Sequence, residues 1–91
     1  SPYRPRAELA GKEARTLARE ILSMTREQFS TDFKGSPMKR AKLRGLKRNA
    51  AVVLGNVGTA EDRDALIRVL DDPEPLVRDH AAWAVDRINA R

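Results

Sequence analysis

Apolar residues recur every three to four positions along most of the chain, a pattern typical of amphipathic helices. The first predicted helix runs from Glu8 to Ser23, and its apolar face consists of Ala10, Ala14, Leu17, Ile21 and Leu22. No segment alternates apolar and polar residues as a half-buried strand does. We therefore expect an all-α fold of about five helices, preceded by a proline-containing linker over residues 1–7 from an upstream module.

Capping residues predict where the next helices begin. Thr25 and Gln28 form the sequence pattern of a capping box, which predicts a short second helix from about Arg26 to Phe33. The run "KGSP" suits the end of that helix and the start of a third, which continues through Val57. Its core face is expected at Leu43, Leu46, Ala50, Val53, Leu54 and Val57, and Gly45 is where it could be interrupted.

Two further helices follow the same logic. Thr59 is a good N-cap for a fourth helix from about Ala60 to Leu70, which is expected to bury Leu66, Ile67 and Leu70. The tight connection "DDPEP" leads to Pro75, a residue suited to the first turn of a fifth helix that ends near Asn89. The core face of the fifth helix is expected at Val77, Ala81, Ala84, Val85 and Ile88.

A weak internal repeat relates the third and fifth helices. A shift of 31 residues aligns "LKRNAAVVLGNV" with "VRDHAAWAVDRI", so that apolar positions and paired alanines coincide. Repeated helical pairs of this length are typical of α-solenoids, and the small alanines allow close helix approach. Residues 8–91 are thus predicted to form a single short HEAT-like α-solenoid domain.

Composition excludes several classes of function. The 91-residue chain has no cysteine and one histidine, His80, so disulfides, cysteine-ligated clusters and a histidine metal site are not expected. No nucleophile triad or phosphate-binding glycine loop stands out, and we expect no catalysis and no cofactor from this chain itself. No apolar run is long enough to span a membrane, and neither a membrane partner nor a signal peptide is expected. The absence of cysteine suits a cytoplasmic location.

Positive charge is concentrated in one segment. Seven of the 18 Lys and Arg residues and none of the 13 acidic residues lie between Phe33 and Ala60. On a helical wheel of the third helix, four of these cations fall in an arc beside the core face, and Lys39 and Lys42 lie just past its far edge. The six of them on the third helix, called the basic ridge below, are Lys39, Arg40, Lys42, Arg44, Lys47 and Arg48.

Such a ridge suits the phosphates of a nucleic-acid backbone, assisted by the free amides of the Ser36 and Pro37 helix start. The segment lacks interleaved aromatic residues, which favours a duplex or stem over a stacked single strand. The alternative is an ordinary solvated helix face. A flank of the fifth helix formed by Leu76, His80, Trp83 and Arg87 offers a different function, the docking of a protein partner or of the chain's own catalytic domain.

The runs "FSTDFKGSPMKRAKLRGLKRNAAVVLGNVG" and "ALIRVLDDPEPLVRDHAAWAVDRI" resemble the C-terminal HEAT-like region of the epoxyqueuosine reductase family, over about Phe29 to Ile88. The resemblance implies a parent protein of that family or a related iron-sulfur protein. These enzymes reduce the epoxide of epoxyqueuosine in tRNA with cobalamin and two 4Fe-4S clusters, whose sites lie upstream and have no counterpart here. What carries over is tRNA contact, near the anticodon stem-loop, through the basic ridge.

Overall fold

The computed structural model describes residues 4–32 and 39–91, and the side chains of residues 9–29 and 41–91. The described residues are all-α, as expected, and contain no strand. In chain order the elements are α1 (Arg4–Ser23), α2 (Arg26–Asp32), α3 (Lys39–Val57), the 3-10 helix η1 (Ala60–Asp62), α4 (Arg63–Ile67) and α5 (Pro75–Asn89).

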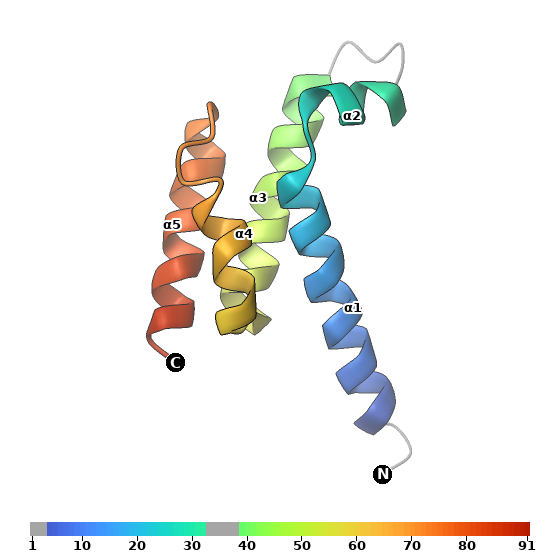
Figure 1. The fold of residues 1–91 in the computed structure, drawn as a ribbon, viewed down its shortest axis with the longest axis vertical. Helices are drawn as coiled ribbons and strands as arrows, with labels where there is room; N and C mark the ends of the chain where they lie inside the picture. The colour runs from blue at the N-terminus through green and yellow to red at the C-terminus, as the bar shows by residue number, and fades with distance from the viewer. Residues whose placement is uncertain (1–3, 33–38) are drawn as a thin grey trace.

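The helices form two antiparallel pairs with α3 in the middle (Figure 1). Helix α3 packs against α1 on one side and α5 on the other, and α4 contacts both α1 and α5. The pairs α1/α3 and α4/α5 are antiparallel, whereas α3 and α5 run in the same direction (Figure 1). Because α3 and α5 are the helices that the internal repeat aligns, this arrangement is compatible with a short HEAT-like stack.

The local signals for the starts of α2 and α5 are confirmed. Thr25 N donates to Gln28 Oε1 at 2.9 Å and Gln28 N to Thr25 Oγ1 at 3.1 Å, which completes the capping box of α2. Pro75 is the first residue of α5. The expected interruption of α3 at Gly45 is wrong, because packed residues on either side hold the helix through it and one glycine costs only about 1 kcal/mol. The expected end of the second helix at Phe33 and the "KGSP" signal lie outside the described residues.

Alanine allows the helices to approach closely in the core. Ala50 and Ala51 of α3 belong to the same buried cluster as Ala81 and Ala84 of α5, the helix against which α3 packs. Larger buried side chains fill the remaining space, and they include Leu22, Leu54, Leu66 and Val77. The core face expected for α5 is confirmed, with Val85 partly buried at its edge.

The face that α1 buries differs from the expected one. Ala18 and Leu22 are buried, whereas Leu17 is 56% exposed and both Ala10 and Ala14 are exposed. Helix α1 begins at Arg4, ahead of the predicted Glu8, and its first half extends beyond the other helices (Figure 1). The second half of α1 packs against α3 and α4, and Ala18 and Leu22 are the residues that this contact buries. At the α3 edges, Leu46 and Val57 are also more exposed than expected.

Helix α4 is shorter than predicted and turns differently at its end. Leu66 is buried as expected, but Ile67 and Leu70 are 49% and 38% exposed, and Val69 is buried instead. Val69 N bonds to Leu66 O and Leu70 N to Ile67 O, both at 3.1 Å. These i to i+3 bonds tighten the last turn, which rotates Val69 rather than Leu70 toward the core.

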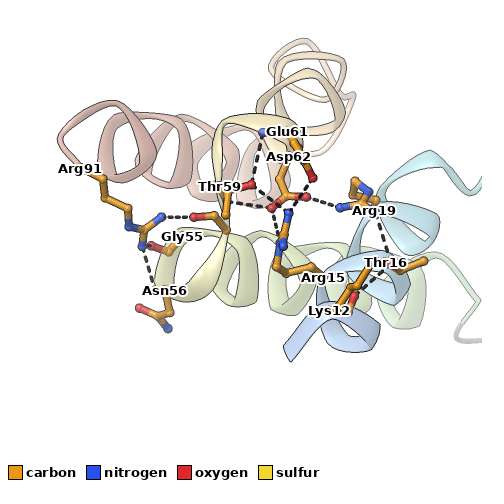
Figure 2. A network of polar contacts seen from close by, with 11 residues as sticks. Lys12, Arg15, Thr16, Arg19, Gly55, Asn56, Thr59, Glu61, Asp62 and Arg91 are labelled. Atoms are coloured by element: carbon orange, nitrogen blue, oxygen red, sulfur yellow. Dashed lines mark hydrogen bonds and ion pairs between the residues drawn. The ribbon is translucent and has the colours of Figure 1, made fainter. Parts of the chain in front are cut away.

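A buried carboxylate joins α1 to the connection between α3 and α4 (Figure 2). The side chain of Asp62 is fully buried; Arg15 Nε donates to its Oδ2 at 2.8 Å, and Arg19 Nη1 bonds to its Oδ1. Thr59 N also donates to Oδ2, at 2.8 Å, as part of a second capping box. The Thr59 cap was predicted, but the role of Asp62 as the meeting point of two arginines was not.

This network predicts a loss of stability in acid. Burial raises the pKa of Asp62, but the hydrogen bonds from Arg15, Thr59 N and Arg19 outweigh burial and hold it below its ordinary value of 3.8. The stabilising interaction is therefore complete above that value and is lost as the pH falls through the lower folded-state pKa. We expect the melting temperature to fall more steeply below about pH 4 in the wild type than in Asp62→Asn. Equal slopes in thermal melts of the two proteins would contradict this.

Arginines from the end of the chain cap the C-terminal end of α3. Arg91 Nη1 donates to Gly58 O at 2.6 Å and its Nη2 to Asn56 O at 2.9 Å, and Nη2 also bonds to Gly55 O (Figure 2). Arg87 Nε donates to the same Gly55 O at 3.0 Å. The last carbonyls of a helix lack intrahelical partners and carry partial negative charge, so these cations satisfy and stabilise them.

Candidate nucleic-acid interface

The basic ridge lies on the N-terminal half of α3. Lys42 is exposed, and Arg44, Lys47 and Arg48 are partly buried. The Nε atom of Arg48 is buried without a hydrogen-bond partner among the described residues. Lys39 and Arg40 form the first turn of α3, but their side chains lie outside those that the structure describes, as does the Ser36 and Pro37 segment.

Two ridge residues meet acidic side chains from the connection between α4 and α5. Arg44 Nη1 lies 3.5 Å from Glu74 Oε2, and Lys47 Nζ lies 3.4 Å from Asp72 Oδ2. The Lys47 and Asp72 side chains are only 12% and 11% exposed, while that of Arg44 is 41% exposed. The basic ridge therefore has no acidic residue beside it in the sequence, but acidic side chains from another segment lie beside it in the folded protein.

Helix α2 adds a cation that the sequence analysis did not single out. Arg26, the first residue of α2, places its Nη2 4.0 Å from Glu74 Oε1. A hollow of about 390 Å³ opens between α2, α3 and the connection, lined by these charged groups and by apolar side chains such as Met24 and Leu43. The tertiary fold thus gathers three cations and two carboxylates around one concavity.

This arrangement can bind oxyanions. Guanidinium and ammonium groups bind phosphate or carboxylate oxygens, and Arg does so with several N–H donors in one plane. Within residues 4–32 and 39–91, no group of three or more His, Cys, Asp and Glu residues is placed to hold a metal ion. In the same part of the chain, no helix combines the length and apolar character that crossing a membrane requires.

The flank of α5 is partly occupied by internal packing. Trp83 is 39% exposed, with the Arg87 guanidinium 5.1 Å from its ring centroid. The ring also lies against Gly55 of α3, where an added Cβ would fall 2.8 Å from Trp83 Cη2. His80 Nδ1 is hydrogen-bonded to Leu76 O at 2.8 Å, within its own helix. Both residues thus have structural contacts, although Leu76 and Trp83 still expose apolar surface.

Comparison with known proteins agrees with the sequence motifs. No family model matches the chain, and no solved structure matches it. The chain is 37% identical over 86 residues to an epoxyqueuosine reductase from Pseudomonas aeruginosa. That alignment covers 93% of this chain but only 23% of the length of that enzyme, in its C-terminal part. The resemblance is thus confirmed, and the chain is similar to the C-terminal part of an epoxyqueuosine reductase.

Proposed function

We propose that this chain is an RNA-binding, HEAT-like domain of a queuosine-pathway protein, and that its basic ridge binds the phosphate backbone of a tRNA near the anticodon stem-loop. The observation that carries the proposal is the concentration of cations on the N-terminal half of one helix. Seven basic and no acidic residues lie between Phe33 and Ala60, although the chain as a whole carries 13 acidic residues. The similarity to a tRNA-modifying enzyme class supports tRNA as the polyanion.

The proposed role in the parent protein is positioning rather than chemistry. The catalytic part, with cobalamin and two 4Fe-4S clusters by family resemblance, would belong to the remainder of a longer protein. Contacts to phosphate give affinity with little sequence information. The domain would therefore hold the tRNA while the catalytic part recognises the modified nucleoside.

Neutralising two ridge residues tests the proposal. In the Arg44→Gln/Lys47→Gln protein, we expect affinity for a tRNA anticodon stem-loop to fall about tenfold at low salt. The slope of log affinity against log salt should decrease by about 2, because two phosphate contacts are lost. Fluorescence anisotropy with a labelled stem-loop across a salt series measures both quantities, and far-ultraviolet circular dichroism verifies folding.

The matched control removes the same charge elsewhere. Arg63 and Arg68 belong to α4 and its C-cap, outside the hollow beside the ridge. The Arg63→Gln/Arg68→Gln protein should bind the stem-loop nearly as well as the wild type. Equal losses of stem-loop affinity in both double variants would show that net charge alone causes the effect. No binding by the wild type at low salt would overturn the proposal.

A second candidate function is protein docking through the flank of α5. A shallow hollow of about 540 Å³ there is lined by Val52, Asn56, Asp79, His80 and Trp83. Binding at this surface would involve an apolar ring and few charges, so it would depend little on salt. The salt series described above therefore separates the two functions.

A further inference from the structure

The ion pairs of the basic ridge have a consequence for how the ridge binds phosphate. Asp72 and Glu74 place carboxylate oxygens 3.4 Å from Lys47 Nζ and 3.5 Å from Arg44 Nη1. A phosphate oxygen that bonded to either cation would need much the same position. Carboxylate and phosphate are therefore alternative ligands of the same two side chains.

Hydrogen bonds to its backbone hold the connection that carries the two carboxylates in place. Asp72 Oδ1 accepts from Glu74 N at 3.0 Å, and Arg78 Nη1 donates to Asp72 O at 2.7 Å. Pro73 and Pro75, on either side of Glu74, restrict the backbone further. The carboxylates are thus presented to the ridge at a high effective concentration and do not have to be ordered when the pairs form.

The degree of burial decides how much these pairs matter. Fully exposed pairs contribute little, because water and salt screen them. The side chains of Lys47, Asp72 and Glu74 are each no more than 12% exposed, so their pairs are screened less. Arg26, 4.0 Å from Glu74 Oε1, adds a third cation around the same two carboxylates.

From this geometry we infer that Asp72 and Glu74 act as intramolecular competitors of nucleic-acid phosphate, and so set the affinity of the basic ridge. The inference rests on the proposed function, since it concerns the same surface. A single anion gains little by displacing one carboxylate. A backbone that brings several phosphates at once can displace both, so the competition favours a polyanion with closely spaced phosphates over scattered negative charge.

Removing the two negative charges tests the inference. Asp72→Asn keeps the oxygen that accepts from Glu74 N, and Glu74→Gln keeps the length of the side chain. We expect the Asp72→Asn/Glu74→Gln protein to bind the anticodon stem-loop about fivefold more tightly than the wild type at low salt, the effect of removing two partly covered ion pairs. Fluorescence anisotropy measures the affinity, and thermal melts followed by circular dichroism verify that the variant is folded.

The matched control is Asp64→Asn/Asp86→Asn, which changes net charge equally. Asp64 lies in the first turn of α4 and Asp86 in the last turn of α5. These helix ends lie at the opposite end of the molecule from α2 and the start of α3 (Figure 1). Because salt screens distant charges, the control should shift affinity by less than about twofold.

The outcomes separate this inference from the proposed function. Binding that is tighter for Asp72→Asn/Glu74→Gln than for the wild type, with no such gain in the control, supports competition. If the wild type binds and Arg44→Gln/Lys47→Gln weakens binding, but neutralising the acids changes nothing or acts no more than the control, the competition is refuted and the RNA-binding function stands. Absence of binding by every variant refutes both.

Discussion

Replacing Asp62 with alanine is expected to lower the free energy of unfolding by about 3 kcal/mol, a large share of the stability of a small domain. The substitution leaves Arg15 and Arg19 without their shared carboxylate and removes the acceptor for Thr59 N. Arg15 depends on Asp62 more than Arg19 does. The hydrogen bond to Asp62 raises the pKa of Arg15, and the Arg15 side chain is only 18% exposed. Chemical denaturation of wild type and variant measures the change.

Two comparisons make this result specific. Glu61, the other acidic partner of Arg15, has an 83% exposed side chain at 3.3 Å, so Glu61→Ala should cost less than about 0.5 kcal/mol. Asp62→Asn keeps an oxygen for the capping box and should lie between the two. If Asp62→Ala were as mild as Glu61→Ala, the network would not be what holds α1 against the start of α4.

The second large effect is expected at Gly55. Alanine usually stabilises the interior of a helix by about 1 kcal/mol relative to glycine. At Gly55, however, a Cβ would lie 2.8 Å from Trp83 Cη2 and closer still to Cζ3, well inside contact distance. We expect Gly55→Ala to destabilise the protein by about 2 kcal/mol, because the tryptophan ring or the α3–α5 spacing must shift.

Gly45 provides the control within the same helix. Nothing lies within 4 Å of a Cβ built there, so Gly45→Ala should stabilise the protein by about 0.5–1 kcal/mol. A double-mutant cycle adds a second check, since Gly55→Ala should lose its cost when Trp83 is already alanine. Stabilisation by Gly55→Ala in the wild-type background would show that the ring does not need the glycine.

Local signals in the sequence were sufficient to place the starts of α2, η1 and α5. The capping box of Thr25 and Gln28, the Thr59 cap and Pro75 all act within a few residues of themselves. Such interactions are encoded next to the backbone groups that they satisfy. The all-α class followed from the helical periodicity of the apolar residues.

The buried face of α1 depended on information that no local pattern contains. Leu17 and Ala18 are adjacent, and periodicity alone favoured the larger apolar residue. The structure buries Ala18 because Arg15 and Arg19 on the same side reach Asp62, 43 or more positions away in the chain. A polar anchor distant in sequence can rotate a helix, and apolar spacing does not record it.

The sequence likewise predicted only part of the candidate interface. The ridge residues could be selected from charge alone. Their pairing with Asp72 and Glu74, however, joins two segments that η1 and α4 separate in the chain. The acidic run "DDPE" was visible, and its density was the signal that could have suggested a partner for the ridge. What the sequence lacked was the α4 turn geometry that brings this connection beside α3.

The arginine caps add polar links between the C-terminal end of α3 and that of α5. Gly55 O accepts from both Arg87 and Arg91, and Arg91 also holds Asn56 O and Gly58 O. If the last turn of α5 opens, two carbonyls at the end of α3 and that of Gly58 just after it lose these donors at once. We therefore expect the two helix ends to open as one cooperative unit. The N-terminal half of α3, with the basic ridge, lies outside that unit.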